Sequence, residues 1–481
     1  MKLGAALGGI PAPPGVADID ITGLSLDSRM IRPGEVFAAL PGARVDGAAF
    51  AQAAVNAGAV AVLAARGVAV ADAPVINVDD PARVLAQMAA RVYGPQPSTV
   101  IAVTGTNGKS STVEFLRQIW AVAGRRAGAL GTLGLTLDNA REPLAHTTPD
   151  AITLHKTLAH AAESGVDHLA MEASSHGLVQ RRLDGVRLSA VGFTNITQDH
   201  LDYHPDFEAY FDAKARLFEA LAPRGAPAVI MVDDARGRAM AERADKAGLN
   251  VIPIGWSGTV WKLDEIEPGA AGQRLRLTID GQAETVALPL PGEFQALNAL
   301  TAAALAHADG VAVETILEAL RGLSGVCGRL EPVGATPHGA RVYVDYAHTP
   351  DGLDKALRAL RPHTAARLIV VFGCGGDRDA DKRPKMGAAA AKLADAVIIT
   401  DDNPRSEEPS AIRAAIRAGA PNAREIADRA AAIDTAVGEL EPGDVLLIAG
   451  KGHETGQIIG DTVIAFSDQE TARAALAQSC G

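Results

Sequence analysis

The sequence predicts an α/β fold in three domains, each with strands and helices that alternate along the chain. A length of 481 residues suits about three domains of ordinary size. Short β-branched and apolar runs recur between helical segments, which is typical of mostly parallel sheets covered by helices. We expect the domains at residues 1–97, 98–327 and 328–481.

The composition excludes several classes of protein. Hydrophobic residues make up 48% and charged residues 21%, which is ordinary for a globular chain. A net charge of −12 argues against a broad nucleic-acid surface. Cys327, Cys374 and Cys480 are far apart and odd in number, so neither a disulfide framework nor a zinc site is indicated. The amino terminus makes a poor signal peptide, and no apolar run could span a bilayer, so we expect a cytoplasmic protein without membrane insertion.

The first domain is predicted to be a small α/β unit that ends at a linker, Gly94–Ser98. An Ala-rich helix is expected at Ala48–Ala57. The expected strands are Val36–Leu40, Val60–Ala64 and Val75–Val78. From the residues alone, the polar segment Ser25–Arg29 is a solvated loop.

The central domain begins with a phosphate-binding pattern. The apolar run from Thr99 breaks into the loop Gly105, Thr106, Asn107, Gly108, Lys109 and Ser110. Val113, Leu116, Ile119 and Trp120 then recur at helical spacing. A strand, a glycine loop and a helix start are the context in which backbone N–H groups close around a phosphate. Lys109 could reach the outer phosphates and Ser110 could bind Mg²⁺, although Val103 stands where the usual first glycine is found.

Polar residues follow the later strands of the central domain, where ligands bind in parallel sheets. The expected strands are Val166–Met171, Leu188–Phe193, Ala228–Val232 and Val251–Ile254. Glu172 follows one strand and Asn195 another. Glu172 and His200 are reasonable Mg²⁺ ligands, with a hydrogen-bonded structural histidine as the alternative for His200. From the residues alone, Lys214 is a solvated helix lysine.

The third domain is predicted to be Rossmann-like, because four strands are each followed by a polar loop. The strands are expected at Val342–Asp345, Leu368–Phe372, Ala396–Thr400 and Val445–Ile448. The loops are Asp345–His348, Gly373–Arg378, Asp401–Arg405 and Gly450–Glu454. Four such loops at strand ends predict a second binding site.

The motifs that carry a family resemblance extend over essentially the whole chain. They are SLDSR (25–29), GTNGKS (105–110), HTTPD (146–150), MEASSHGL (171–178), TNITQDHLDYH (194–204), KxxLF (214–218), GRLE (328–331), DYAHTPDGL (345–353), DNPR (402–405) and GKGHE (450–454). Together they resemble the Mur ligases, whose three domains take a UDP-sugar substrate, ATP and an incoming amino acid. DNPR and SLDSR favour the members that add the third residue of the peptidoglycan stem peptide.

The resemblance implies an ATP-dependent amide ligase that adds meso-diaminopimelate to UDP-N-acetylmuramoyl-L-alanyl-D-glutamate through an acyl phosphate, with Mg²⁺. The residues implied for ATP are Gly105, Thr106, Asn107, Gly108, Lys109, Ser110, Ser111, Asn298, Arg329 and Asp345. Ser110, Glu172, His200 and Lys214 as a carbamate would face the metal, and Lys109, Glu172, His200 and Lys214 would serve catalysis. The UDP-substrate set is Leu26, Ser28, Thr147, Thr148, Ser174, Gln180 and Arg182. The diaminopimelate set is Arg378, Asp402, Asn403, Pro404, Arg405, Gly450 and Glu454.

Two departures from the family pattern occur, and several alternatives remain open. Asp46–Phe50 lacks the polar residues usual after Asp-Gly, and Ser111 stands where Thr is common. The alternatives within the class are a lysine-adding Mur ligase and a ligase like folylpolyglutamate synthase. A non-catalytic sugar-nucleotide module would not need Lys109, Glu172 and Lys214 together, and a P-loop motor or signalling ATPase would not need the four loops of the third domain.

Overall fold

The computed structural model describes residues 1–481 except 12, 43–44, 139, 198–202, 270–271 and 479–481. The chain divides into two compact units. The first unit contains residues 1–262 and 300–316, and the second contains residues 263–299 and 317–481. The division into three domains at residues 97 and 327 stays a prediction.

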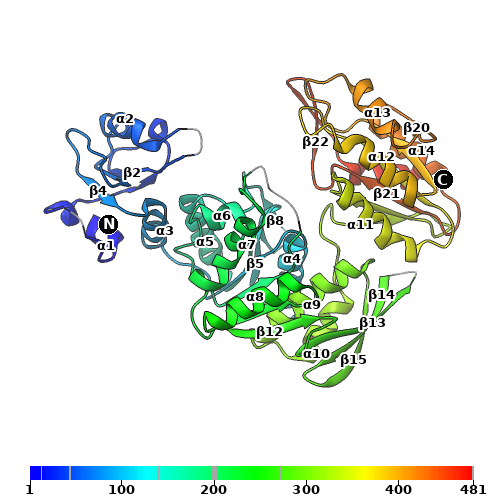
Figure 1. Ribbon diagram of the computed structural model, residues 1–481, viewed down its shortest axis with the longest axis horizontal. Helices are drawn as coiled ribbons and strands as arrows, with labels where there is room; N and C mark the ends of the chain where they lie inside the picture. Colours follow the sequence, from blue (N-terminus) through cyan, green and yellow to red (C-terminus); the bar gives the residue numbers. More distant parts are fainter. Residues whose placement is uncertain (12, 43–44, 139, 198–202, 270–271, 479–481) are drawn as a thin grey trace. The chain divides into compact units, whose positions relative to one another are not determined.

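The first unit begins with a parallel four-stranded sheet in the order β1-β2-β3-β4 (Figure 1). The strands are β1 (Gly23–Ser25), β2 (Glu35–Ala39), β3 (Ala61–Ala65) and β4 (Val75–Val78), and the helices are α1 (Leu3–Leu7), α2 (Ala51–Asn56) and α3 (Pro81–Val92). Asp80 caps α3 and Pro81 occupies its first turn, a favourable helix start. The α3 residues Val84, Leu85 and Met88 are buried against the sheet.

The rest of the first unit is built on a mostly parallel sheet in which β5 lies between β9 and β10. Its strands include β5 (Thr99–Thr104), β6 (Ala127–Gly131), β7 (Gly134–Leu137), β8 (Ala140–Glu142), β9 (His168–Glu172), β10 (Ala190–Phe193), β11 (Pro227–Met231) and β12 (Asn250–Gly255). The predicted strands are confirmed to within two residues at each end. Because β5, β9 and β10 are parallel neighbours, the segments that follow them meet at one edge.

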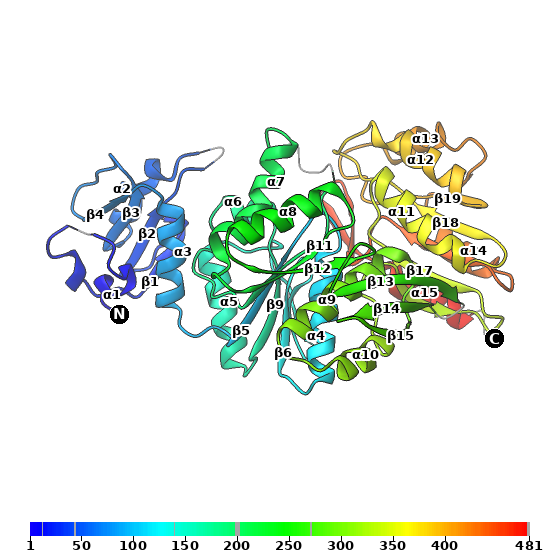
Figure 2. The same cartoon turned by 60° about the horizontal axis from the view of Figure 1, so that its bottom comes forward.

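Both faces of the inner strands β5, β9 and β10 are buried, as expected for a doubly covered parallel sheet (Figure 2). The helices are α4 (Lys109–Val122), α5 (Ala151–Glu163), α6 (Ser175–Val179), α7 (Phe207–Arg216) and α8 (Ala235–Lys246). The predicted stripe of Val113, Leu116, Ile119 and Trp120 is buried along α4. The helix therefore packs its apolar face inward while its first residue, Lys109, stays at the loop.

Three strands that follow β12 in the chain were not expected from the sequence, and they continue the same sheet beyond β12. They are β13 (Trp261–Gly269), β14 (Gly272–Ile279) and β15 (Gln282–Leu288). β14 and β15 form an antiparallel hairpin across Asp280 and Gly281, whose φ angles are +47° and +79°. An Asp-Gly pair between alternating residues is a strong local hairpin signal, so the sequence did contain the information.

The second unit contains a six-stranded sheet in the order β16-β17-β21-β18-β19-β20 (Figure 1). The strands are β16 (Glu331–Ala335), β17 (Arg341–Asp345), β18 (Leu368–Phe372), β19 (Ala396–Ile399), β20 (Arg424–Glu425) and β21 (Val445–Ala449). A separate hairpin consists of β22 (Gly456–Ile459) and β23 (Thr462–Ala465). The helices that follow β17 in the chain are α11 (Pro350–Leu360), α12 (Lys382–Leu393), α13 (Pro409–Arg417), α14 (Arg429–Gly438) and α15 (Asp468–Gln478).

The strand order of the second unit brings the predicted polar loops together. β17, β21, β18 and β19 are consecutive and parallel, so the loops after their carboxyl ends share one edge of the sheet. The four strands predicted for this region are confirmed. β16, β20 and the β22–β23 hairpin were not expected.

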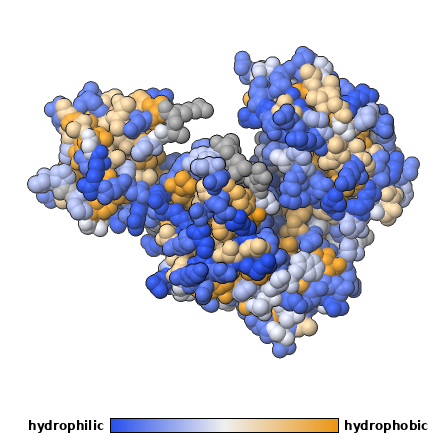
Figure 3. All heavy atoms as spheres, viewed as in Figure 1, coloured by the Kyte–Doolittle hydropathy of each residue, from blue (hydrophilic) through white to orange (hydrophobic). Residues whose placement is uncertain are grey.

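On the visible face, hydrophilic residues are widespread and hydrophobic ones are scattered among them (Figure 3). Within the described part of the chain, no helix combines the length and the apolar composition that crossing a bilayer requires.

Candidate functional site

The predicted phosphate loop joins β5 to α4 and depends on two glycines. Gly105 has a φ of +153°, and a Cβ atom at this position would collide with the Thr194 hydroxyl oxygen. Gly108 has a φ of +86° and is the N-cap of α4. A residue with a side chain would be strained at either position. The loop therefore turns directly into the start of α4, whose first backbone N–H groups can bind an anion.

The end of β10 anchors the phosphate loop. The Asn107 N–H donates to the Asn195 side-chain oxygen at 3.0 Å, and the Thr194 hydroxyl donates to the Asn107 carbonyl at 2.7 Å. The Thr106 N–H donates to the Asn195 carbonyl at 2.9 Å. The sequence indicated Asn195 by its place after a strand. It gave no sign that Thr194 fills the space beside Gly105.

Two lysine ammonium groups approach the same loop carbonyl. Lys109 Nζ donates to the carbonyls of Gly105 and Thr106, each at 2.9 Å, and Lys214 Nζ donates to that of Gly105 at 2.8 Å. Lys214 is only 1% exposed, so the alternative of a solvated helix lysine is wrong. Two cations beside the N-terminus of α4 make this edge of the sheet attractive to polyphosphate.

Glu172 lies at the end of β9, beside the loop, and is almost fully buried. Its Oε1 atom accepts hydrogen bonds from the Ser110 hydroxyl and the Thr132 N–H, both at 2.8 Å. Its Oε2 atom accepts from the Thr132 hydroxyl at 3.3 Å. A buried carboxylate and a hydroxyl in contact are hard oxygen donors, which fit the preference of Mg²⁺.

The residues predicted to face a metal are Ser110, Glu172, His200 and Lys214. Of these, His200 lies outside the described residues. In the part of the chain that is described, no group of three or more His, Cys, Asp and Glu side chains is arranged to hold a metal. The roles assigned to Ser110, Glu172 and Lys214 toward a metal therefore stay proposals.

The residues expected to hold the sugar-peptide meet beside Glu172. The Thr148 hydroxyl donates to the Glu172 carbonyl at 2.9 Å and accepts from the Ser174 N–H at 3.0 Å. The Thr147 and Thr132 hydroxyl oxygens are 3.0 Å apart. Thr147, Thr148 and Ser174 thus come together at the end of β9, although Thr148 is 24 positions from Glu172 and 26 from Ser174 in the sequence.

Arg182 and Gln180 extend this cluster. The Arg182 guanidinium donates to the Thr148 carbonyl, and to Oε1 of Gln180 at 2.6 and 3.1 Å. Burial lowers the pKa of Arg182, and Asp150 partly opposes that shift. Gln180 Nε2 donates to the Tyr203 hydroxyl at 3.2 Å. A partly buried guanidinium among amide and hydroxyl groups can bind a carboxylate or a peptide carbonyl.

The predicted uridine contacts lie on the small sheet. Leu26 packs against the core of that sheet, and Ser28 opens a short 3₁₀ turn, Ser28–Met30, capped by Asp27. In the Asp46–Phe50 segment, the Asp46 side chain accepts from the Ala48 N–H at 3.0 Å. These are ordinary contacts within turns. By themselves they do not indicate that either loop binds a ligand.

Three residues predicted to bind ATP belong to the second unit. Asp345 ends β17 and accepts from the N–H groups of Leu330 and Ala347 at 2.7 and 2.8 Å. Desolvation raises the pKa of Asp345, and the nearby Arg329 lowers it in part. The Arg329 guanidinium lies 5.0 Å from the centre of the Tyr346 ring. Asn298 is buried within α9 (Glu293–Ala308). The fold thus brings Arg329 and Asp345 together.

The loops after β19 and β21 meet, as their strand order requires. Asn403 Nδ2 donates to Glu454 Oε2 at 2.9 Å. Gly450 has a φ of +117°, and a Cβ atom there would press against the Asp402 carboxylate. Asp402, Asn403, Gly450 and Glu454, which were predicted to bind the amino acid, therefore form one cluster. Lys451 lies among them and was not predicted as a site residue, although the GKGHE loop contains it.

Arg405 is held against backbone rather than in a surface ion pair. Its Nη1 donates to the Gly376 carbonyl at 2.8 Å, whereas Glu407 pairs with Arg383 at 2.8 Å. The Glu407 carboxylate is therefore the partner of Arg383 and not of Arg405. Arg405 has a φ of +53°, and hydrogen bonds to Ile458 and Gly460 of the β22–β23 hairpin hold its backbone.

Arg378 and Pro404 lie in the loops that follow β18 and β19. Arg378 follows β18, and its Nη1 donates to the Asp377 carbonyl at 3.4 Å. Pro404 is buried directly before Arg405. Guanidinium groups, carboxylates and an amide gathered at one sheet edge can bind a molecule with both ammonium and carboxylate groups.

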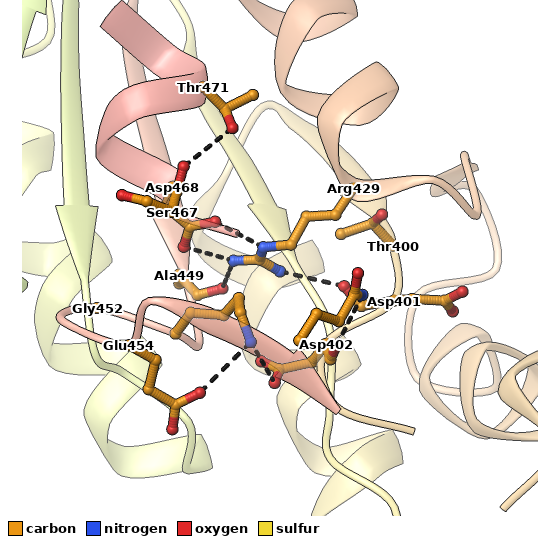
Figure 4. A network of polar contacts seen from close by, with 12 residues as sticks. Thr400, Asp401, Asp402, Arg429, Ala449, Gly452, Glu454, Ser467, Asp468 and Thr471 are labelled. Carbon is orange, nitrogen blue, oxygen red and sulfur yellow. Dashed lines mark hydrogen bonds and ion pairs between the residues drawn. The ribbon is translucent and has the colours of Figure 1, made fainter. Parts of the chain in front are cut away.

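An ion pair that the sequence did not reveal lies behind this cluster (Figure 4). Arg429 and Asp468 are fully buried and form hydrogen bonds of 2.7 and 2.8 Å. Arg429 also donates to the carbonyls of Ala449 at 2.9 Å and Asp401 at 3.4 Å. Those carbonyls directly precede Gly450 and Asp402. Figure 4 shows the Arg429 guanidinium between Asp468 and these two backbone groups.

Three family models match the chain. They are "Mur ligase family, catalytic domain" at residues 20–93, "Mur ligase middle domain" at 103–306, and "Mur ligase, glutamate ligase domain" at 328–452.

Curated relatives match almost the full length of the chain. The UDP-N-acetylmuramoyl-L-alanyl-D-glutamate–2,6-diaminopimelate ligase of Mesorhizobium japonicum is 52% identical over 462 residues, which are 96% of both chains. The ligase of the same name from Bradyrhizobium diazoefficiens is 52% identical over 482 residues, which are 99% of both chains.

Solved structures agree with these matches. A structure of a ligase with that name is 33% identical, covers 99% of both chains and has a TM-score of 0.77. The MurF ligase of Thermotoga maritima in complex with ADP is 19% identical, with a TM-score of 0.64 over 96% of this chain and 98% of that one. The second likeness supports the fold alone.

Proposed function

Since the chain belongs to the Mur ligase family, we propose that it adds meso-diaminopimelate to UDP-N-acetylmuramoyl-L-alanyl-D-glutamate with cleavage of ATP. The observation that carries this proposal is 50–52% identity, over 96% or more of the chain, to ligases named for 2,6-diaminopimelate. The step belongs to cytoplasmic peptidoglycan precursor synthesis.

The reaction takes place in two steps. The γ-phosphoryl group of ATP is transferred to the side-chain carboxylate of the glutamyl residue, which releases ADP and leaves an acyl phosphate. The amine of diaminopimelate then attacks the acyl carbon, loses its proton and displaces phosphate as the amide forms. Lys109 and the N–H groups of the loop offset the charge of the transferring phosphoryl group.

The residues beside the loop fit a magnesium site. Ser110 and Glu172 would hold the ion, and Mg²⁺ bound there would neutralise charge on the phosphates. Lys214 is assigned as a carbamate on the family resemblance, and its burial at the Gly105 carbonyl supports a role at the phosphates. Carbamylation would replace an ammonium that repels a metal with an anionic oxygen group.

The two substrates are assigned to separate clusters. Thr147, Thr148, Ser174, Gln180 and Arg182 would hold the muramoyl dipeptide. The hydrogen bonds that link Thr148 to the Glu172 carbonyl, to Ser174 and to Arg182 support this. Leu26 and Ser28 would contact the uridine. The amino acid would bind among Asp402, Asn403, Arg405 and Glu454, with Arg378, Pro404 and Gly450. Arg405 is suited to the carboxylate that diaminopimelate has and lysine lacks.

Phosphate release from ATP tests the function. Purified protein with the UDP-linked dipeptide should release phosphate when meso-diaminopimelate is added, and much less with lysine. Lys109→Ala should abolish release while binding of the UDP-dipeptide persists. Turnover with lysine alone would favour the lysine-adding ligase, and turnover with a folate would favour a ligase like folylpolyglutamate synthase.

A further inference from the structure

Lys451 is a fully buried cation in the loop after β21. Its Nζ atom lies 2.9 Å from Asn403 Oδ1, 3.3 Å from Glu454 Oε2 and 3.9 Å from Asp402 Oδ1. A buried ammonium is tolerated only when it is paired and hydrogen-bonded. Here all three partners are residues to which the acceptor amino acid has been assigned.

The contacts of Lys451 determine how Asn403 is oriented. Asn403 Oδ1 accepts from both Lys451 Nζ and the Ile458 N–H, each at 2.9 Å. With its oxygen facing two donors, the amide must turn its nitrogen the other way. Nδ2 accordingly donates to Glu454 Oε2 at 2.9 Å. Without Lys451, only the Ile458 N–H would hold the Asn403 amide in this orientation.

Lys451 and Asn403 together restrict the carboxylate of Glu454. Both donate to Oε2, and among the described residues Oε1 accepts no hydrogen bond. The Glu454 side chain is 34% exposed. One oxygen thus anchors the carboxylate, and the other is left for a ligand at the open side of the cluster.

The local charge favours an ammonium ligand. Lys451 offsets only one of the two carboxylates, Asp402 and Glu454, so one negative charge remains. Arg405 and Arg378 lie in the neighbouring loops and suit carboxylate groups. An α-amino acid presents an ammonium and a carboxylate a few bonds apart, which matches this separation of charge.

We propose that Lys451 is a positioning residue for the acceptor amino acid. It fixes the Asn403 amide and the Glu454 carboxylate so that Glu454 presents Oε1 to an ammonium group of the substrate. This inference rests on the proposed function. It differs from a purely structural role, in which Lys451 would only balance buried charge and its loss would impair all substrates alike.

Steady-state kinetics of Lys451→Met test the proposal. The KM for diaminopimelate should rise about 30-fold or more, on the scale of truncating one partner of a buried charge pair. The KM values for ATP and for the UDP-dipeptide should change by less than about twofold. Lys355→Met is the matched control, because Lys355 is in the same unit but lies on the surface, paired with Asp351 at 2.6 Å. It should leave all three KM values unchanged.

Two further variants keep the test decisive if Lys451→Met does not fold. Lys451→Arg retains the charge but has a planar head, so it should fold and still raise the KM for diaminopimelate selectively. Glu454→Gln combined with either Lys451 variant should add little to the single effects, because the two residues act as one unit.

Three experimental results would contradict either the role of Lys451 or the proposed function. A folded Lys451 variant with wild-type KM for diaminopimelate overturns the role of Lys451. Equal rises in all three KM values point to a structural role and also overturn it. Wild-type protein that does not turn over diaminopimelate overturns the proposed function itself, and the inference about Lys451 with it.

Discussion

The Ser110 hydroxyl donates a 2.8 Å hydrogen bond to Oε1 of Glu172 and so joins the phosphate loop to the end of β9. The two residues are 62 positions apart in the chain. The same carboxylate oxygen accepts from the Thr132 N–H. The position of the loop and that of the buried carboxylate are therefore coupled, and both depend on β5 and β9 being parallel neighbours.

Glu172→Gln should reduce kcat by about 100-fold or more, because the site loses the negative charge assigned to the metal while the shape is kept. Phosphate release should be measured over a range of Mg²⁺ concentrations, and excess Mg²⁺ should recover part of the rate. Glu163→Gln, an exposed change in α5, is the control. Wild-type kcat at low Mg²⁺ in the Glu172 variant would rule out this residue as a metal ligand.

Lys214→Ala should abolish turnover, because the carbamate assigned to this buried lysine would be missing. Added short-chain carboxylic acids should restore part of the rate by placing an anionic group in the space. In the wild type, ¹³C-bicarbonate should give a carbamate signal by NMR that the variant lacks. A variant that turns over at the wild-type rate in bicarbonate-free buffer would disprove the assignment.

Arg405→Ala should weaken the use of diaminopimelate by about 30-fold, since truncating one partner of a desolvated charge pair costs about 2–5 kcal/mol. The KM for ATP should change little. The comparison is kcat/KM for diaminopimelate and for lysine, with Arg358→Ala as control because Arg358 lies on the surface and pairs with Asp354. If diaminopimelate use stays within a few-fold of wild type, the choice of amino acid is made elsewhere.

His155 should make the protein less stable in mild acid. It is 2% exposed, and neither ring nitrogen has a hydrogen-bond partner among the described residues. Burial, helped by Arg187, lowers its pKa from 6.5 to about 4. The unfolded chain takes up a proton near pH 6.5 and the folded protein only near pH 4, so stability is lost as the pH falls through this window.

The size of the His155 effect is about 3 kcal/mol, because a pKa difference of one unit corresponds to about 1.4 kcal/mol. Urea unfolding at pH 7.5 and pH 4.5 should show that His155→Leu removes most of this loss. His160→Gln, an exposed change in the same helix, should retain it. The same pH dependence in wild type and in His155→Leu would show that other groups cause it.

The phosphate loop could be predicted from the sequence because its determinants are local. Gly105, Gly108 and Lys109 lie within five consecutive residues, and the strand and helix on either side follow from short apolar periodicities. The same reasoning found the strands that end at Glu172 and Asp345. The β14–β15 hairpin is equally local, because the Asp280–Gly281 pair at its turn lies directly between the two strands.

The contact between the loops of the third domain could not be predicted from local sequence patterns. Sequence reasoning placed Asn403 and Glu454 after separate strands, and the family resemblance assigned both to one ligand. That they touch follows from the strand order, which sets β21 next to β18 and β18 next to β19. No periodicity in the chain specifies that order.

What the sequence by itself determined is the α/β class, the main parallel strands of each sheet and the local phosphate loop. The tertiary structure alone decided which polar side chains are buried and what they contact. Lys214 reaches the Gly105 carbonyl across 109 residues, and Arg429 meets Asp468 across 39. The physical reason is that local backbone preference acts over a few residues, whereas the burial of a charge depends on which distant groups packing brings within hydrogen-bond reach.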